Sequence, residues 1–178
     1  TDGSFRPAAP VTREEIAKVI ARLCTDDPQA ENLTAFADTA GSWGNLYVCF
    51  CAERGVITGD GQGAFRPKDA VTARELAKML LVVADYKPDI EGYTGAGWNL
   101  NVIRDAQTAG MFKGYTLAYS AAATRQQAAQ LFSNAILETQ MAVYIGDTRV
   151  NDLALITNTG TIGGRYFGLF TVTGILTK

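Results

Sequence analysis

Three short segments place an arginine in the first turn of a predicted helix. They are Thr12-Arg13-Glu14-Glu15, Thr72-Ala73-Arg74-Glu75 and Thr124-Arg125-Gln126-Gln127. In each, a threonine and a Glu or Gln three residues later have the spacing of a capping box, which explains those two positions structurally. The arginine is not explained in this way, because a cation in the first turn opposes the helix macrodipole. A guanidinium beside helix-start amides suits a carboxylate or phosphate; the alternative is an ordinary solvated face.

Two tryptophans and an aspartate are further candidates for ligand contacts. Trp43 and Trp98 open predicted helices, and each either packs in the core or forms an aromatic wall that covers a sugar ring. Asp38 either orders the approach to the following helix or accepts hydrogen bonds from sugar hydroxyls. In the ligand alternatives, these residues together with the arginines would recognise an anionic, hydroxyl-rich ligand.

Catalytic and metal sites are not predicted. The chain has no histidine, which removes the usual general base and the commonest transition-metal ligand. Cys24, Cys49 and Cys51 are an odd number, so we interpret them as free thiols, with one bridge from Cys24 left open. The loop Gly59-Asp60-Gly61 lacks the Gly-Lys-Ser/Thr ending of a nucleotide loop, and Asp60 and Asp69 do not fit an EF-hand. We expect no enzyme, no metal and no cofactor.

Internal repeats supply the helices that must position these residues. Phe5-Arg6-Pro7 recurs 60 residues later as Phe65-Arg66-Pro67, and an apolar stripe follows both segments and recurs after Thr124. The stripe has the period of an amphipathic helix, which we call the capped helix. A second, front helix repeats at a shift of 55: Trp43, Val48, Cys51, Gly55 and Gly59 correspond to Trp98, Ile103, Ala106, Gly110 and Gly114.

The repeats predict a mainly α fold. Units of helix, Gly-rich loop and helix cannot bury their stripes alone, so three of them are expected to form a pseudo-threefold helical domain. We place this domain at 1–141, with units of about 1–30, 31–90 and 91–141. The first unit lacks its front helix, which either lies outside the chain or is supplied by another element.

The segment 142–178 has a different character, being rich in Thr and Gly with short β-prone runs at 142–145 and 166–173. Gly163-Gly164 is predicted to be a hairpin turn between Thr161-Ile162 and Arg165-Tyr166. The segment is either a set of strands docked on the helical part or the start of a further domain.

Length and composition limit the remaining possibilities. The 178 residues suit one domain, and 47% hydrophobic with 19% charged residues excludes a disordered chain. A net charge of −2 gives no indication of nucleic-acid binding, and no apolar run approaches the roughly 18 residues of a membrane span. The chain begins at Thr1 without a leader pattern, so we expect a processed protein or part of a longer one.

The order of these motifs resembles the S-layer homology (SLH) family. The similarity rests on Phe36-Ala37-Asp38, Trp43, Gly55-Val56-Ile57-Thr58-Gly59, Gly63-Ala64-Phe65-Arg66-Pro67 and the Val71-Thr72 and Glu75 positions. It covers residues 1 to about 140 and is weakest in the third unit. The resemblance implies a three-pronged helical domain with ligand grooves between neighbouring units. It also implies non-covalent anchoring of an exported protein to secondary cell-wall polysaccharide, which often ends in a pyruvylated amino sugar.

The resemblance also implies specific ligand-binding residues: Arg13, Arg125, Arg74, Trp43, Trp98, Asp38, Gly59 and Gly114. The second unit departs from the pattern, because Ala73 occupies the arginine position and Arg74 lies one residue later. Tyr93 stands where an aspartate is expected, and 115–123 replaces the Gly-x-Phe-x-Pro segment. One or two of the three grooves are therefore expected to be competent.

We predict a non-catalytic, extracellular anchor on a bacterial surface or cell wall. Arg13 and Arg125 would pair with the anionic group of the glycan, helix-start amides would orient it, and Trp43 or Trp98 would pack on the sugar. The alternative is a degenerate scaffold or protein–protein docking module, in which the two arginines would be tied to carboxylates or packed flat. The incomplete first repeat is also a candidate surface for self-association.

Overall fold

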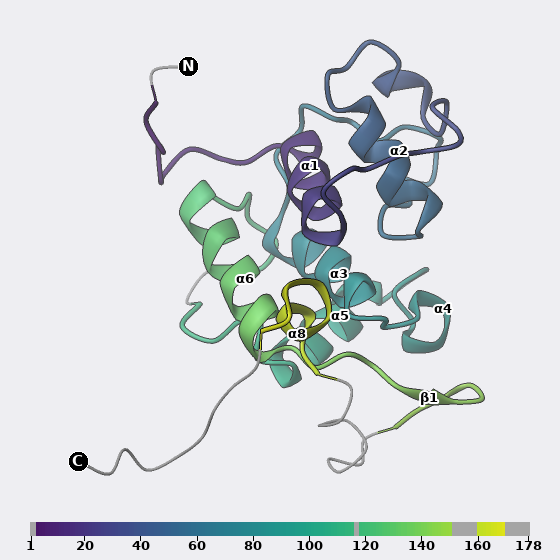
Figure 1. Ribbon diagram of the computed structural model, residues 1–178, viewed down its shortest axis with the longest axis vertical. Coiled ribbons are helices and arrows are strands. Elements are labelled where there is room, and N and C mark those ends of the chain that lie inside the picture. Colours follow the sequence, from purple (N-terminus) through teal and green to yellow (C-terminus); the bar gives the residue numbers. More distant parts are fainter. Residues whose placement is uncertain (1–2, 116–117, 151–159, 170–178) are drawn as a thin grey trace.

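A computed structural model describes residues 3–115, 118–150 and 160–169 of the chain. In these residues the fold is mainly α-helical with one small antiparallel sheet, as predicted (Figure 1). The elements in chain order are α1 (Arg13–Cys24), η1 (Ala37–Thr39), α2 (Asn45–Glu53), α3 (Ala73–Val83), α4 (Pro88–Glu91), α5 (Trp98–Thr108), α6 (Arg125–Glu138), β1 (Tyr144–Ile145), β2 (Thr148–Arg149) and α8 (Ile162–Phe167).

Three of the helices begin at the predicted threonine caps. Thr12, Thr72 and Thr124 each accept a hydrogen bond from the backbone N–H three residues later. The Glu or Gln at that later position accepts one in return from the N–H of the threonine. The capping box satisfies N–H groups that a helix start otherwise leaves unpaired, so α1, α3 and α6 begin where the sequence predicts.

A closed ring of backbone hydrogen bonds joins the three caps. The N–H of Val11 donates to the carbonyl of Ala123 at 3.0 Å, that of Val71 to Val11 at 3.0 Å, and that of Ala123 to Val71 at 2.8 Å. Each of these residues directly precedes a capping threonine, so the same position of each unit contacts the next. The approximate threefold relation of the units is therefore built into the backbone at the helix starts.

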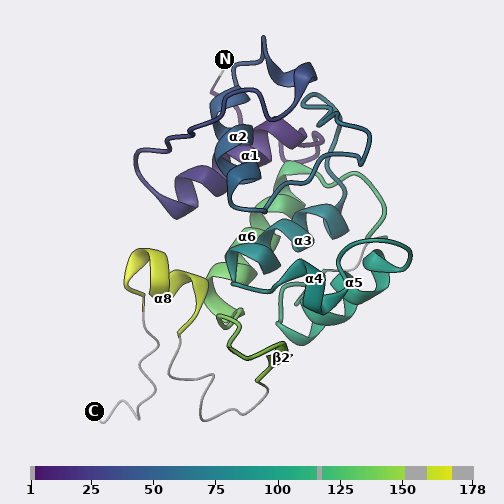
Figure 2. The same ribbon diagram turned by 90° about the vertical axis from the view of Figure 1, so that its right-hand side faces the viewer.

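Each capped helix packs against a helix that comes later in the chain. The pairs are α1 with α2, α3 with α5, and α6 with α8 (Figures 1 and 2). The stripe positions Ile16, Leu76 and Leu131 have almost no exposed surface. The helices are thus stabilised by burial of their apolar faces, which isolated helices of this length cannot achieve.

The C-terminal part differs in two respects from the sequence prediction. Ala142–Ile145 is partly strand, as expected, and β1 pairs with β2. Gly163 and Gly164 form no hairpin turn but lie in α8, because the Thr161 side chain caps the helix by accepting from the Gly164 N–H. A Cβ on Gly163 would lie 2.7 Å from the Ile136 carbonyl oxygen, so glycine allows α8 to approach α6 closely. Tyr166 and Phe167, which begin the second β-prone run, are also helical because α8 continues through them, and residues 170–173 of that run lie outside the described residues.

Candidate functional site

Arg13 connects α1 to the second unit. Its Nε donates to the carbonyl of Phe65 at 2.7 Å, and one terminal nitrogen lies 2.9 Å from the Glu75 carboxylate. The guanidinium carbon is 4.7 Å from the centre of the Phe65 ring. Because only 12% of the Arg13 side chain is exposed, the residue stabilises the unit interface as well as bordering a groove.

Arg125 makes the same set of contacts one unit earlier in the ring. Its Nε donates to the Phe5 carbonyl at 2.9 Å, its terminal nitrogen lies 3.1 Å from Glu15, and it covers the Phe5 ring at 5.6 Å. Its side chain is 36% exposed, three times as much as that of Arg13. The third equivalent pair is Ala73 and Gln127, which cannot form an ion pair.

The helix-start amides are not available to a ligand, which corrects the sequence prediction. The N–H of Arg13 donates to the Asp69 carbonyl at 2.9 Å, and that of Glu14 to the Pro67 carbonyl at 3.0 Å. Equivalent bonds occupy the first two N–H groups of α3 and α6, and the capping threonine takes the third. The preceding loop of a neighbouring unit therefore fills the position that we had expected for an anion.

Two grooves lie between units, and each contains one of these arginines. Groove A, of about 610 Å³, is bordered by Arg125, Glu15, Lys18 and Trp43, with Phe5, Val19 and one side of α6. Groove B, of about 450 Å³, is bordered by Arg13, Glu75, Lys78 and Trp98, with Met79 and 56–61. Both grooves therefore carry the same quartet of Arg, Glu, Lys and Trp.

The two lysines were missed by the sequence analysis. Lys18 Nζ lies 5.5 Å from the Trp43 ring centre, and Lys78 Nζ lies 5.3 Å from that of Trp98. Neither has a carboxylate within 4 Å among the described residues. Burial lowers the pKa of Lys78, with the nearby Glu75 acting in the opposite direction. A usable signal was present, because each lysine follows the capping-box glutamate by three residues and so shares its helix face.

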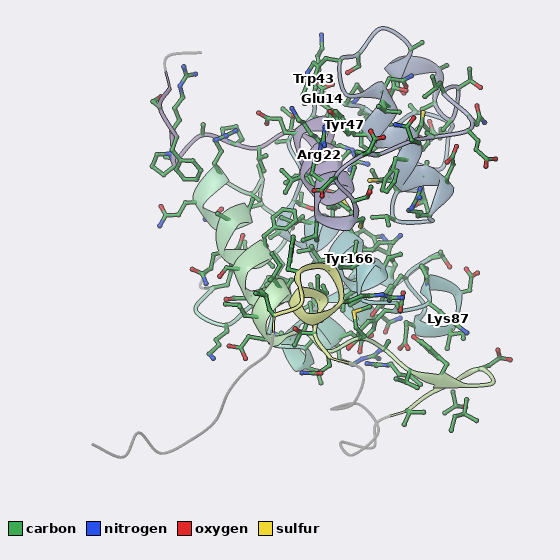
Figure 3. All side chains as sticks on the ribbon, viewed as in Figure 1. Glu14, Arg22, Trp43, Tyr47, Lys87 and Tyr166 are labelled. Atoms are coloured by element: carbon green, nitrogen blue, oxygen red, sulfur yellow. The ribbon has the colours of Figure 1, made fainter. Side chains whose placement is uncertain are left out.

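The tryptophans differ in exposure. Trp43 is largely exposed and packs edge-on against Tyr47, with 6.5 Å between ring centres (Figure 3). Trp98 is half-buried, and the Arg74 guanidinium lies 5.6 Å from its ring centre. Arg74 therefore packs on Trp98 at the edge of groove B, and it does not take the place of the arginine that is absent at position 73.

Asp38 and Gly59 hold the loop that borders groove B. The Asp38 carboxylate accepts the N–H of Phe65 at 3.0 Å and that of Arg66 at 2.7 Å. Desolvation opposes ionisation of Asp38, but these backbone donors outweigh it and keep its pKa below the ordinary value. Gly59 has φ +67°, and a Cβ there would lie 2.6 Å from the Phe36 ring and 2.8 Å from the Ala64 carbonyl oxygen. Gly114 shares the positive φ but borders neither groove.

The described residues also bear on other kinds of site. They contain no group of three or more Cys, Asp or Glu placed to hold a metal ion, and none of their helices is long and apolar enough to cross a membrane. Cys24, Cys49 and Cys51 are free thiols, the last two fully buried. Burial raises the pKa of Cys51, which suits an unreactive core residue.

Three capped helices joined in a ring, with grooves between units, define a helical-repeat domain. Residues 1–17 and 35–77 match the S-layer homology domain. Over these segments the chain is similar to the SLH-domain family, and the matched residues include Arg13, Asp38, Trp43, Gly59 and Glu75.

Several curated proteins are similar to parts of the chain. An uncharacterized cell wall amidase of Bacillus anthracis is 27% identical over 53% of this chain and 20% of its own length. Cell surface glycoprotein 1 of Acetivibrio thermocellus is 32% identical over 45% of this chain and 4% of its own length. The S-layer protein sap of Bacillus anthracis is 31% identical over 49% and 10%. The chain thus spans a small part of the length of each relative. The SLH match and the names of these relatives indicate a location at the cell surface or in the cell wall.

Proposed function

We propose that the protein anchors to the bacterial cell wall by binding an acidic secondary cell-wall polysaccharide, with groove B as the principal site. The SLH match and the surface-protein relatives support cell-wall anchoring in general terms. The observation that carries the finer proposal is the repeated quartet, which places Lys78, Trp98, Arg13 and Glu75 around one groove. We assign no catalytic step to this chain.

The chemistry of groove B suits a charged sugar. The Trp98 ring provides an apolar face, and Lys78 adds a positive charge beside it. Arg13 and Glu75 largely neutralise each other, so the lysine is the cation in the quartet best placed to pair with an acidic substituent, such as the carboxylate of a pyruvyl group. A charge-assisted hydrogen bond of this kind contributes about 1.5–3 kcal/mol and weakens with salt where it is exposed.

The three positions around the ring differ in their fitness for this task. Groove A has the same quartet but is wider and more open on its α6 side. At the third position Ala73, Gln127 and Gln130 replace the Arg, Glu and Lys of the other two. We therefore rank groove B first, groove A second, and assign no glycan to the third position.

A scaffold or protein-docking module is the second candidate. It is favoured by the contacts of Arg13 and Arg125, which are tied to carboxylates and packed on phenylalanine rings as that alternative requires. These contacts mean that loss of either arginine affects the fold, so the arginines alone cannot separate the two functions.

Co-sedimentation with purified bacterial cell walls tests the proposal. We expect binding to walls that retain their secondary polysaccharide and none after its chemical removal. Lys78→Gln and Trp98→Leu should each weaken binding about tenfold or more, which corresponds to about 1.4 kcal/mol. Lys18→Gln tests groove A, and Lys68→Gln, at an exposed position outside both grooves, is the matched control. Equal binding by folded Lys78→Gln and Lys68→Gln would refute groove B, and no binding to any wall would favour the scaffold.

A further inference from the structure

One side of α6 lacks the helix that covers the same side of α1 and α3. The second, fifth and ninth residues of α1 are Glu14, Ala17 and Ala21, and all three are buried. The corresponding residues of α6 are Gln126, Ala129 and Ser133, and all three are exposed. Since the fifth and ninth residues of α3, Ala77 and Leu81, are also buried, α6 is the exception among the capped helices.

In α1 the covering element is the front segment of the next unit. Ser42 donates its hydroxyl to the Glu14 carboxylate, and the thiol of Cys51 contacts the Ala17 carbonyl at 3.5 Å. In α3 the same role falls to α5 and its Trp98. The helix α8 does not take this place on α6, because it packs near Ile136 and leaves Ala129 and Ser133 exposed.

The residues that face this open side of α6 are also less buried than their equivalents. Phe65 is 0% exposed beneath Phe36, with 5.6 Å between ring centres, whereas Phe5 is 53% exposed. Met79 is 5% exposed in groove B, but the equivalent Val19 is 46% exposed in groove A. The exposed apolar surface is therefore continuous from Phe5 across groove A to α6.

We propose that groove A is a docking site for a front-type polypeptide segment. By this we mean a segment with the pattern of residues 36–59: a phenylalanine two residues before an aspartate, a tryptophan, a short amphipathic helix and a Val-Ile-Thr-Gly exit. Segments of the front type, α2 and α5, occupy the two equivalent positions inside this molecule. The docked helix covers Ala129 and Ser133, its leading phenylalanine covers Phe5, and its apolar exit covers Val19.

Docking also alters groove A as a binding site. In groove B the exit residues of α2, from Val56 to Gly59, form one wall. An equivalent wall narrows groove A toward the shape of groove B and supplies a counterpart of Gly59. The docking proposal rests on burial and internal repetition, and it stands whether or not either groove binds a glycan.

Cysteine accessibility tests the proposal in the full chain. We compare Ser133→Cys with Gln130→Cys, which lies on α6 at the position of the exposed Lys18, and follow maleimide modification at each site by mass spectrometry. A copy of residues 31–60 is fused ahead of Thr1, the position that corresponds to Gly61. The unfused chain with the same residues as a synthetic peptide is the second arm, which remains informative if the fusion does not fold.

We expect the fused segment to slow modification at position 133 at least tenfold and at position 130 by no more than about twofold, because the equivalent Lys18 stays exposed although Trp43 lies beside it. Ala129→Glu in the fused chain should restore rapid modification, whereas Gln130→Glu, with the same charge change, should not. Equal rates at position 133 with and without the segment, in both arms, would overturn the proposal. The proposal would also be overturned if position 133 of the unfused chain became protected as the protein concentration rises, because that result assigns this face to a second copy. Protection of position 133 by wall polymer alone would overturn it as well.

Discussion

The contacts of Arg13 predict that Arg13→Ala is strongly destabilising. The substitution removes a charged donor from the Phe65 carbonyl, an ion pair with Glu75 and a cation–π contact on a fully buried ring. The charged hydrogen bond is worth about 1.5–3 kcal/mol, and the partly exposed ion pair adds up to about 1 kcal/mol. Because the three contacts share one side chain and are not additive, we expect the free energy of unfolding to fall by about 2–4 kcal/mol.

Arg125→Ala is the matched control, because Arg125 makes the same three contacts at the equivalent position. Its side chain is more exposed, and the Phe5 ring beneath it is exposed as well. Water competes for each contact, so we expect a loss of only about 0.5–1.5 kcal/mol. Because the partners and the geometry are nearly the same, the difference between the two losses of unfolding free energy measures the effect of burial.

Urea unfolding at pH 7, followed by circular dichroism, measures both values. In thermal unfolding, a chain of this size changes its Tm by about 2–4 °C per kcal/mol, so Arg13→Ala should lower the Tm by about 4–16 °C. The effect of Arg125→Ala should shrink further in 1 M salt, because exposed pairs are screened. Equal losses for the two variants, or a loss below about 1 kcal/mol for Arg13→Ala, would refute the argument that burial makes Arg13 a structural link.

Two further predictions concern other charged groups. Arg149 and Arg104 both lie 3.1 Å from the buried carboxylate of Asp105, but the Arg104 side chain is mostly exposed. We therefore expect Arg149→Ala to lower the free energy of unfolding by about 2–4 kcal/mol and Arg104→Ala to lower it by less than about 1 kcal/mol. Similar urea midpoints for the two variants would contradict this. Hydrogen bonds from the Gln62 N–H, the Arg66 side chain and the Ala64 N–H lower the pKa of Asp60 to about 2. Asp60 therefore stabilises the fold above about pH 4 and loses this effect as the pH falls toward 2. Asp60→Asn should make the urea midpoint less dependent on pH between about pH 4 and pH 2. A variant whose midpoint has the same pH dependence as that of the unsubstituted chain would show that the loop does not depend on this carboxylate.

Local pattern was enough to predict the helices and their starts. Thr12, Thr72 and Thr124 have glutamate or glutamine three residues later, and the apolar stripes after them have helical period. Capping and amphipathicity are properties of neighbouring residues, so one sequence contains the information. The same reasoning singled out Arg13, Arg125 and the two tryptophans, which line the two grooves, whereas Gly59 came from the family resemblance.

Contacts between units could not be predicted in the same way. The sequence indicated that helix-start amides were free, but the Asp69 and Pro67 carbonyls of the neighbouring unit occupy them at α1. Gly163-Gly164 has the composition of a turn, yet the close approach to Ile136 makes these glycines part of a helix. Both outcomes depend on which segment packs alongside, which propensity does not encode.

The third unit separates what the fold requires from what a ligand requires. It keeps the threonine cap, the ring hydrogen bond of Ala123 and the buried stripe of α6. Its Gln127 replaces the glutamate, and Ala73 of the second unit replaces the arginine that would face it, so the absence of both is expected from their pairing between units alone. Pairing does not account for Gln130, which stands where Lys18 and Lys78 lie over the tryptophans of the other two grooves. The lysine is present where an arginine and a tryptophan border a groove and absent where they do not, and this association supports a binding role for the quartet beyond its contribution to stability.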